Sequence, residues 1–300
     1  MLICDTHADT LYALQRGVLE TDITHERLTQ NPTDVRVQAL ALFTGEGGLA
    51  DDPNLIQREL DVFAGLKAAG FHQITRLTDA LPGIPNVLLT TEGGEVYSSG
   101  VDTVDAFYAL GVRMAGLVWN NPCELAYPAS GDDAWGLTDY GKQVVRRMHS
   151  LGMAVDISHL NPRGVMDLLD MGGAAPLASH SCVHALCPHP RNLTDDQLRA
   201  LLAAGGFIGV NFYSVFLSPD GIATLDTVID HLAYICDMGG KQQVGLGSDF
   251  DGIDRYPQGL RHAGDVHALL DRLRQRGFGE KLTHGIAGEN FRRYFERVQR

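Results

Sequence analysis

Three absences narrow the kind of protein that this sequence encodes. The five cysteines are an odd number and form no Cys-x-x-Cys pair, which argues against a disulfide framework and favours a reducing compartment. The first residues lack the basic segment and cleavage site of a secretion signal, and no apolar run reaches about 18 residues. We therefore expect a soluble, cytoplasmic protein with no membrane partner.

Positive charge is also scarce. The chain has 24 lysines and arginines against 37 aspartates and glutamates, a formal net charge of −13. This balance disfavours nucleic acids and acidic membrane surfaces as partners, whereas bound divalent cations would offset part of the negative charge. With 300 residues and 44% hydrophobic content, the chain can bury a large core, either as one barrel-like α/β domain or as two ordinary domains.

Apolar runs and amphipathic segments alternate along the chain. The runs are mostly continuous, as in strands covered on both faces, and eight of them lie near residues 2–7, 37–44, 86–91, 112–119, 153–158, 176–180, 206–213 and 243–249. Apolar residues at helical spacing predict helices over residues 55–69, 138–151, 161–171, 194–204, 222–238, 264–276 and 288–298. This alternation implies parallel βαβ units.

Eight such units favour a single α/β domain over residues 1–300, a (β/α)8 barrel of the TIM type. A doubly wound open sheet is the alternative, but no Gly-x-Gly-x-x-Gly follows the first run. Residues 17–36 and 121–135 are expected to form long surface connections. The sequence contains no repeat, no low-complexity tract and no linker between domains.

Polar residues that can bind metals end several of the predicted strands. In a barrel of this type the active site forms at the carboxyl ends of the strands, so these residues would meet at one rim. Asp5, His7 and Asp9 occupy alternate positions, which on a strand share one face. Together the strand ends supply three histidines and three carboxylates as candidate ligands: His7, Asp9, Glu92, His159, His180 and Asp249.

This set exceeds what one catalytic zinc ion uses, since such an ion takes about three protein ligands and keeps one position open. Glu92 could place one oxygen on each of two ions, which would then share and activate a water molecule as hydroxide. Related barrel hydrolases often bridge their metals with a modified lysine. None of the four lysines of this chain follows a predicted strand, so a carboxylate bridge is the simpler prediction.

The strand-end motifs resemble those of the membrane dipeptidase (renal dipeptidase) family of binuclear zinc peptidases. The motifs occur in the order of the family and span nearly the whole chain: DTHAD at 5–9, TEGG at 91–94, DISH at 156–159, SHS at 179–181, RN at 191–192 and GSDFDG at 247–252. The resemblance implies an amidohydrolase-type barrel with two zinc ions. It also implies hydrolysis of the single amide bond of a dipeptide by a hydroxide that bridges the metals.

The same resemblance implies a role for each ligand. His7 and Asp9 would hold one zinc ion, His159 and His180 the other, and Glu92 would bridge them. Asp249 matches the catalytic acid or base that moves a proton between the water and the leaving amine. Asp251 is the competing candidate for that role, with a structural place in a turn as its other interpretation.

Three residues are implied to contact substrate besides Asp249. Arg191 matches the arginine that binds the terminal carboxylate of the dipeptide, for which a planar guanidinium is suited, and Tyr213 matches a tyrosine of the pocket. The chain departs from the family after the fourth strand, where a histidine that polarises the scissile carbonyl is replaced by Trp119 or Asn120. Asn120 can donate a hydrogen bond there but cannot become cationic.

The expected function is therefore a zinc-dependent dipeptidase whose partner is a small dipeptide, with D-residues tolerated at the carboxyl-terminal position. A homodimer is expected because similar proteins form dimers. Two alternatives stay open at this point. One is a binuclear hydrolase of another small amide, a β-lactam or a lactone, and the other is a metal-binding homologue without catalysis.

Overall fold

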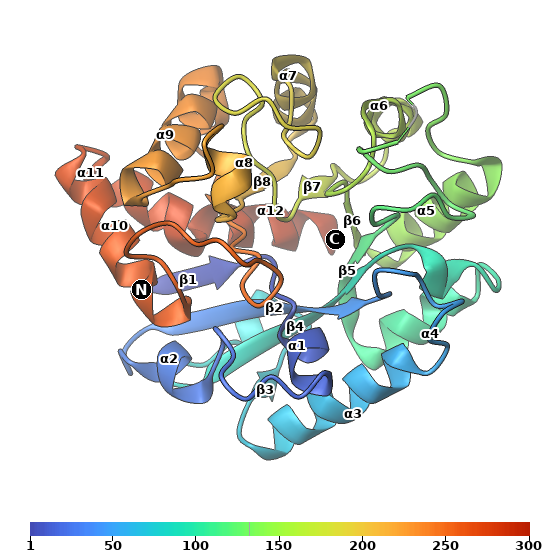
Figure 1. Cartoon of the computed structure of the whole chain (residues 1–300), viewed down its shortest axis with the longest axis horizontal. Helices are drawn as coiled ribbons and strands as arrows, with labels where there is room; N and C mark the ends of the chain where they lie inside the picture. The colour runs from blue at the N-terminus through green and yellow to red at the C-terminus, as the bar shows by residue number, and fades with distance from the viewer. Residues whose placement is uncertain (132) are drawn as a thin grey trace.

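Parallel pairing between strands organises the chain into a closed barrel (Figure 1). The structure is a computed structural model that describes residues 1–131 and 133–300. Its strands are β1 (Leu2–Asp5), β2 (Val35–Phe43), β3 (His72–Gln73), β4 (Pro85–Glu92), β5 (Val112–Gly116), β6 (Ala154–Asp156), β7 (Leu177–Ala178), β8 (Phe207–Val210) and β9 (Val244–Leu246). Eight strands form the ring β1–β2–β4–β5–β6–β7–β8–β9, and β9 pairs again with β1. The predicted (β/α)8 fold is confirmed.

Six of the eight barrel strands are shorter than the apolar runs that predicted them, and β2 and β4 are slightly longer. The run at 112–119, for example, contains β5 only up to Gly116, although Leu117 and Val118 are fully buried. An apolar run indicates that residues are buried, but not that they are hydrogen-bonded to a neighbouring strand. Here the chain remains buried for several residues after its hydrogen bonds to the neighbouring strands end. Most site residues therefore lie just beyond the strands, whereas Glu92 is the last residue of β4. Strand β3 lies outside the ring and pairs with the start of β4, and its two polar residues gave no apolar run to detect.

Helices surround the barrel (Figure 1). They are α1 (Thr10–Gln15), α2 (His25–Thr29), α3 (Leu55–Ala68), α4 (Thr103–Leu110), α5 (Asp139–Leu151), α6 (Pro162–Met171), α7 (Asp195–Ala204), α8 (Ser214–Leu217), α9 (Leu225–Ile235), α10 (Val266–Gln275), α11 (Gly279–His284) and α12 (Asn290–Val298). All seven predicted helices are present. Thr138 and Thr194 cap α5 and α7 through their side-chain oxygens, as expected for hydroxyl residues at that position.

The prediction of a purely surface connection over residues 17–36 is wrong. This segment contains the short helix α2, which Thr24 caps, and it buries Ile23 and Leu28 to 2% exposure. The two apolar side chains are isolated in the sequence, so no periodic pattern marked them. The other connection, 121–135, is irregular in its described part, and residue 132 lies outside the described residues.

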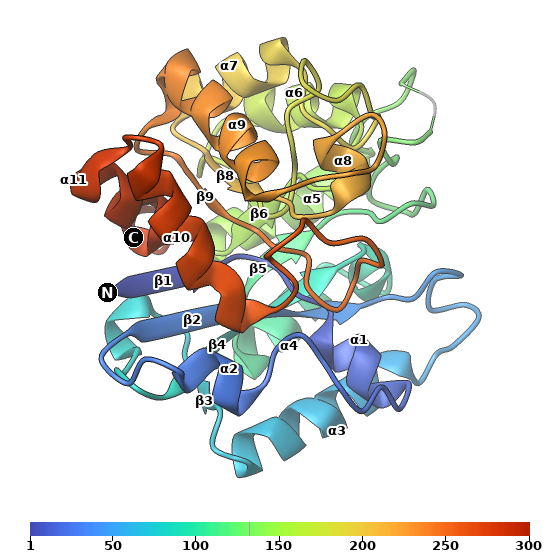
Figure 2. The same ribbon diagram turned by 60° about the vertical axis from the view of Figure 1, so that its left-hand side comes forward.

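The amino end of the barrel is closed by aromatic packing. Phe291 and Tyr294 of α12 contact Phe207 of β8, with ring centroids 5.2 and 5.8 Å apart. Figure 2 shows α10, α11 and both chain ends toward this side of the molecule, where β1 and β2 begin. Among the described residues, no helix combines the length and apolar character needed to cross a membrane. The opposite, carboxyl end of the barrel is the one left for a site.

Candidate functional site

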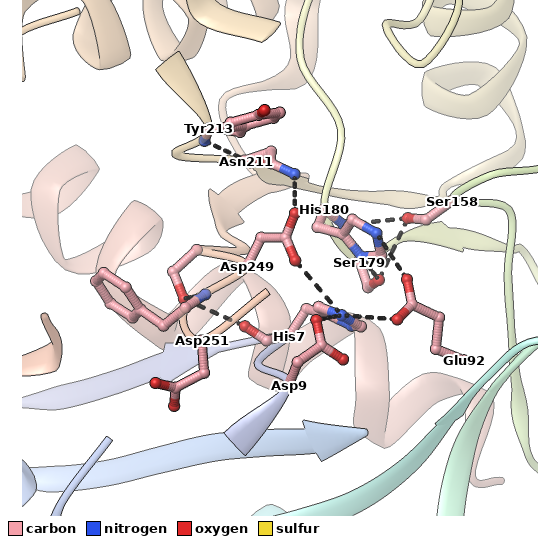
Figure 3. Close-up of polar contacts among 12 residues, drawn as sticks. His7, Asp9, Glu92, Ser158, Ser179, His180, Asn211, Tyr213, Asp249 and Asp251 are labelled. Carbon is pink, nitrogen blue, oxygen red and sulfur yellow. Dashed lines mark hydrogen bonds and ion pairs between the residues drawn. The ribbon is translucent and has the colours of Figure 1, made fainter. Parts of the chain in front are cut away.

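The ligands predicted from the sequence converge at the carboxyl end of the barrel, and all of them are buried there. They come from five strand ends far apart in the sequence. Figure 3 shows His7, Asp9, Glu92, His180 and Asp249 pointing toward a common centre. We describe this cluster in two parts that differ in their chemistry, the carboxylate side (His7, Asp9 and Asp249) and the imidazole side (His159 and His180), which meet where the rings of His7 and His180 lie with centroids 3.9 Å apart.

The carboxylate side is assembled where the chain leaves β1 and β9. The backbone N–H of Asp9 donates to the carbonyl of Phe250 at 2.9 Å, and that of Asp249 donates to the carbonyl of His7 at 3.2 Å. These bonds extend the β1–β9 contact past the strands. They hold His7 Nε2 3.4 Å from Asp9 Oδ2 and 3.8 Å from Asp249 Oδ1. One nitrogen and two carboxylate oxygens thus face one another.

Glu92 lies between the two sides, at the end of β4. Its Oε1 is 2.9 Å from His159 Nε2 and 3.4 Å from His180 Nε2, while its Oε2 is 3.6 Å from His7 Nε2. Each oxygen of this carboxylate therefore faces a different set of donors. Gly93 and Gly94 make this position possible, because a Cβ on Gly93 would collide with Thr44 and one on Gly94 with the carbonyl of Leu117.

Each imidazole of the imidazole side has an oxygen behind its Nδ1. His180 Nδ1 is 2.7 Å from Ser179 Oγ, and that hydroxyl donates in turn to Asp156. His159 Nδ1 is 2.9 Å from Asn120 Oδ1. Such contacts fix the orientation and the tautomer of a metal-binding histidine. Ser179 and Asp156 were not recognised as site residues from the sequence, although both belong to the motifs quoted above.

Two neighbouring carboxylates do not face the centre. The expectation that Asp5 shares a face with His7 and Asp9 is not met, because β1 ends at Asp5. Its Oδ1 accepts instead from the backbone N–H groups of Ser248 at 2.9 Å and His7 at 3.4 Å. Asp251 accepts from Thr10 Oγ1 and from the backbone N–H of Asp22, both at 2.6 Å. Asp249, rather than Asp251, therefore lies beside His7.

The pKa values of the side chains are raised on the carboxylate side and lowered on the imidazole side. Burial disfavours the charged imidazole of His7, but Glu92 and Asp9 outweigh it and raise the pKa of His7 well above its usual value. Burial raises the pKa of Asp249 to about 6. On the imidazole side, burial lowers the pKa of His159 to about 4 and that of His180 well below its usual value. Those two rings are neutral at pH 7, which is the form that binds metals.

The site has the chemistry of a divalent metal site. His7 Nε2 and Asp9 Oδ1 are buried and have no hydrogen-bond partner among the described residues, and buried polar groups normally have one. Gly252 leaves space beside them, since an added Cβ would collide with Asp9 Oδ2 and lie 2.7 Å from Asp249 Oδ1. Imidazole nitrogens and carboxylate oxygens are ligands for zinc and related ions. The donor set therefore fits a metal cofactor.

A cavity of about 630 Å³ opens above these ligands. Arg191 lies in its wall at 8% exposure, with Nη2 3.5 Å from the carbonyl of His180 and no partner for Nε among the described residues. Its guanidinium carbon lies 5.7 Å from the ring centre of Phe216. Trp119, Asn120 and Tyr213 also line the cavity. A buried cation with an open donor therefore faces the same space as the candidate ligands.

Asn211 is a site residue that the sequence did not reveal. Its Nδ2 donates to Asp249 Oδ2 at 2.8 Å, and its Oδ1 accepts from the backbone N–H of Tyr213 at 2.6 Å (Figure 3). Backbone strain is a second feature without a sequence signal. Among the described residues, the non-glycine residues with positive φ are His159, Asp249 and Asp251. Strained backbone of this kind concentrates at functional sites.

The sequence pattern of the membrane dipeptidase family (peptidase family M19) matches residues 1–300. The chain belongs to this family. The resemblance inferred from the strand-end motifs is thereby confirmed, and so is the assignment to a family of metallopeptidases.

Individual relatives are consistent with membership of the M19 family. The chain is 36% identical over 217 residues to an uncharacterized protein in the pqqA 5' region of Klebsiella pneumoniae, a match that covers 69% of this chain and 80% of that protein. It is 31% identical over 220 residues to dipeptidase 3 of Rattus norvegicus, where the match covers 71% of this chain but only 45% of the rat protein.

Solved structures show the same M19 barrel. A metallo peptidase from Rhodobacter sphaeroides, bound to a phosphinate mimic of the dipeptide L-Ala-D-Ala, has a TM-score of 0.86 at 26% identity and covers 99% of each chain. The dipeptidase AC, a metallo peptidase of family M19, has a TM-score of 0.88 at 26% identity, and the match covers 100% of this chain and 99% of the other.

Proposed function

We propose that this protein is a binuclear zinc dipeptidase, carried by one barrel domain over residues 1–300. The observation that supports this most directly is the position of Glu92. Its two carboxylate oxygens face two different sets of donors, within 3.6 Å of three histidine nitrogens. A carboxylate placed in this way suits a bridge between two cations.

In this proposal His7 and Asp9 would hold one ion, His159 and His180 the other, and Glu92 both. When bound, the two ions would polarise the scissile carbonyl and supply water with a lowered pKa. The neutral state of the two imidazole rings supports their assignment as ligands. The unpartnered atoms on the carboxylate side support the assignment of His7 and Asp9.

Asp249 is proposed as the group that moves the proton. Asn211 fixes its Oδ2, which leaves Oδ1 directed toward the centre beside His7. Burial raises its pKa to about 6, and a group whose pKa lies near the working pH can both accept and release a proton. Asp249 is thus suited to take a proton from the attacking water and return it to the leaving amine.

Arg191 is proposed to recognise the substrate. Its buried guanidinium, with Nε open, would bind the free carboxylate of a dipeptide, which limits the substrate to one residue beyond the scissile bond. Asn120 and Tyr213 line the same cavity and are proposed to contact the substrate. Tolerance of a D-residue at the carboxyl-terminal position is supported by the related enzyme that binds a mimic of L-Ala-D-Ala.

A second candidate keeps the same site and changes the substrate to another small amide, a β-lactam or a lactone. The neutral Trp119-Asn120 pair after β5 favours it, because the cationic group expected there in the family is missing. The cytoplasmic location and the homodimer stay predictions from the sequence, which cell fractionation and size-exclusion chromatography would test.

Metal analysis combined with a substrate panel tests the proposed function. We expect two zinc ions per chain after purification in the presence of zinc, and cleavage of free dipeptides that include D-residues at the carboxyl-terminal position. At most one ion per chain after reloading would contradict the bridge. Faster cleavage of β-lactams or lactones than of any dipeptide would favour the second candidate.

A further inference from the structure

The two rings of the imidazole side reach the centre through the same atom. His159 Nε2 and His180 Nε2 lie 3.1 Å apart, and both are within 3.4 Å of Glu92 Oε1. A neutral imidazole has one proton to place on its two nitrogens. If Nε2 is to offer its lone pair to a cation, the proton has to be on Nδ1, and whatever accepts that proton selects the tautomer.

For His159 the acceptor is Asn120, in the loop that follows β5. Its Oδ1 lies 2.9 Å from His159 Nδ1. The neighbouring residues hold this loop over the site. Trp119 packs against Phe43 and His159, with ring centroids 5.0 and 5.9 Å apart, and Asn121 Nδ2 donates to the carbonyl of Glu46 at 2.9 Å. The contact of Asn120 with His159 is therefore built into the wall of the cavity.

We propose that Asn120 is a positioning residue for metal binding, which holds His159 in its Nδ1–H tautomer with Nε2 directed at the centre. The inference rests on the proposed function, because it requires the site to bind cations. It gives Asn120 a role that is separate from its predicted contact with substrate. The carbonyl oxygen of the amide serves the histidine, whatever the amide nitrogen does in the cavity.

The Nδ1 atoms of His180 and His159 contact partners of different kinds, and this difference determines how large a loss of metal affinity we expect. His180 Nδ1 contacts the hydroxyl of buried Ser179, which donates in turn to the carboxylate of Asp156. His159 Nδ1 contacts only the neutral side-chain amide of Asn120 among the described residues, and Asn120 is exposed. Removing such a partner typically lowers metal affinity by 10–100-fold. Because water can partly replace an exposed acceptor, we expect the lower end, about tenfold, for Asn120.

The test compares three variants of the full-length protein. Asn120→Leu keeps the approximate size of the side chain but removes the acceptor. Asn120→Asp keeps an acceptor oxygen and adds a charge. Asn121→Leu is the matched control, on an adjacent exposed asparagine whose contact is with Glu46. Zinc affinity is measured by titration against a metal-binding dye, and the cobalt-substituted proteins are compared by their visible absorption.

We expect Asn120→Leu to bind one of the two ions about tenfold more weakly, with an altered cobalt spectrum. Asn120→Asp should match or exceed the wild-type affinity, and Asn121→Leu should equal the wild type. Wild-type affinity for both ions in Asn120→Leu would overturn the inference and leave Asn120 with a substrate role alone. Equal weakening in Asn121→Leu would also overturn it, by reducing the effect to loop disruption. A wild-type protein that binds no divalent ion would overturn the proposed function itself and this inference with it.

Discussion

The carboxylate side and the imidazole side differ in the direction in which the pKa values of their residues are shifted. On the carboxylate side, Asp9 and Asp249 are buried together, so that their pKa values rise and that of His7 rises with them. On the imidazole side, burial lowers the pKa values of His159 and His180, and the nearby Arg191 and His7 lower them further. One side concentrates negative charge, and the other keeps its donors neutral.

This difference separates two tasks within one cluster. Groups with raised pKa values near neutrality can exchange protons, whereas neutral imidazoles with low pKa values can only donate electron pairs. We therefore assign the proposed proton transfer to the carboxylate side, where Asp249 lies. The imidazole side is proposed to hold a cation, and Glu92 faces both sides, with Oε1 toward His159 and Oε2 toward His7.

We expect the largest effect from replacing Glu92, because this residue contacts both sides. In Glu92→Gln the bridge loses its charge and one acceptor oxygen, so we expect both ions to bind weakly and turnover to become undetectable. His180→Ala, the matched variant, should weaken mainly one ion. Zinc content after dialysis against a weak chelator measures both. If Glu92→Gln lost only one ion, the two sides would not share a ligand.

Asp249→Asn tests whether proton transfer belongs to the carboxylate side. Asparagine keeps the shape of the side chain but cannot carry the proton, and general acid–base groups contribute about 10²–10⁴-fold to turnover. We expect a loss of that size in kcat with the fold and at least one ion retained, as shown by circular dichroism and metal analysis. Asp251→Asn is the control. A near-normal kcat in Asp249→Asn would remove this residue from the mechanism.

Arg191→Ala tests the recognition of the substrate carboxylate beside the imidazole side. Losing a charge-assisted contact costs a few kcal/mol, or about two orders of magnitude in rate. Wild-type protein should therefore cleave free dipeptides about 10²-fold faster than the same dipeptides with an amidated carboxyl end, as kcat/KM. The variant should lose this preference. Equal rates for free and amidated dipeptides in the wild type would refute the contact.

The last prediction concerns stability rather than turnover and asks how far the electrostatic influence of the carboxylate side extends. Glu59 of α3 is fully buried and accepts from the backbone N–H of Phe43 at 2.9 Å. Burial, with Asp9 and Glu92 as further causes, raises its pKa from 4.5 to about 9. Folding therefore takes up a proton between these values, so the contribution of Glu59 to stability is complete below pH 4.5 and is lost as the pH rises through about 9.

Glu59→Gln should remove this pH dependence. Between pH 5 and pH 8 the wild type should lose up to about 4 kcal/mol relative to the variant, at about 1.4 kcal/mol per pH unit. Urea unfolding at both pH values, with metal-loaded protein, measures the difference. The exposed Glu20→Gln is the control. Parallel pH profiles for wild type and Glu59→Gln would show that Glu59 is ionised in the folded protein.

The barrel and the cluster of candidate ligands could be predicted from the sequence because both leave local signals. Continuous apolar runs marked the eight barrel strands, and each ligand follows such a run within a short motif. The sequence did not predict partners that come from distant segments. Asn211 supports Asp249 from another strand end, and Asn120 meets His159 only because β5 pairs with β6. The end of β1 at Asp5 was also hidden, since the apolar run was interpreted as a strand over residues 2–7.

The pairing of β1 with β9 has a consequence for how the protein is made. Asp5 pairs with Leu246, so the first strand waits for its neighbour while about 240 residues are synthesised, roughly 12 to 50 s at the usual speed of ribosomes. During that time β1 has an open edge, a state prone to wrong pairing with other chains. The five proposed metal ligands are all present once His180 has been added, but Asp249, the proposed proton carrier, follows only with the last barrel strand, so we expect a partial chain on the ribosome to be able to bind metal before it can be active.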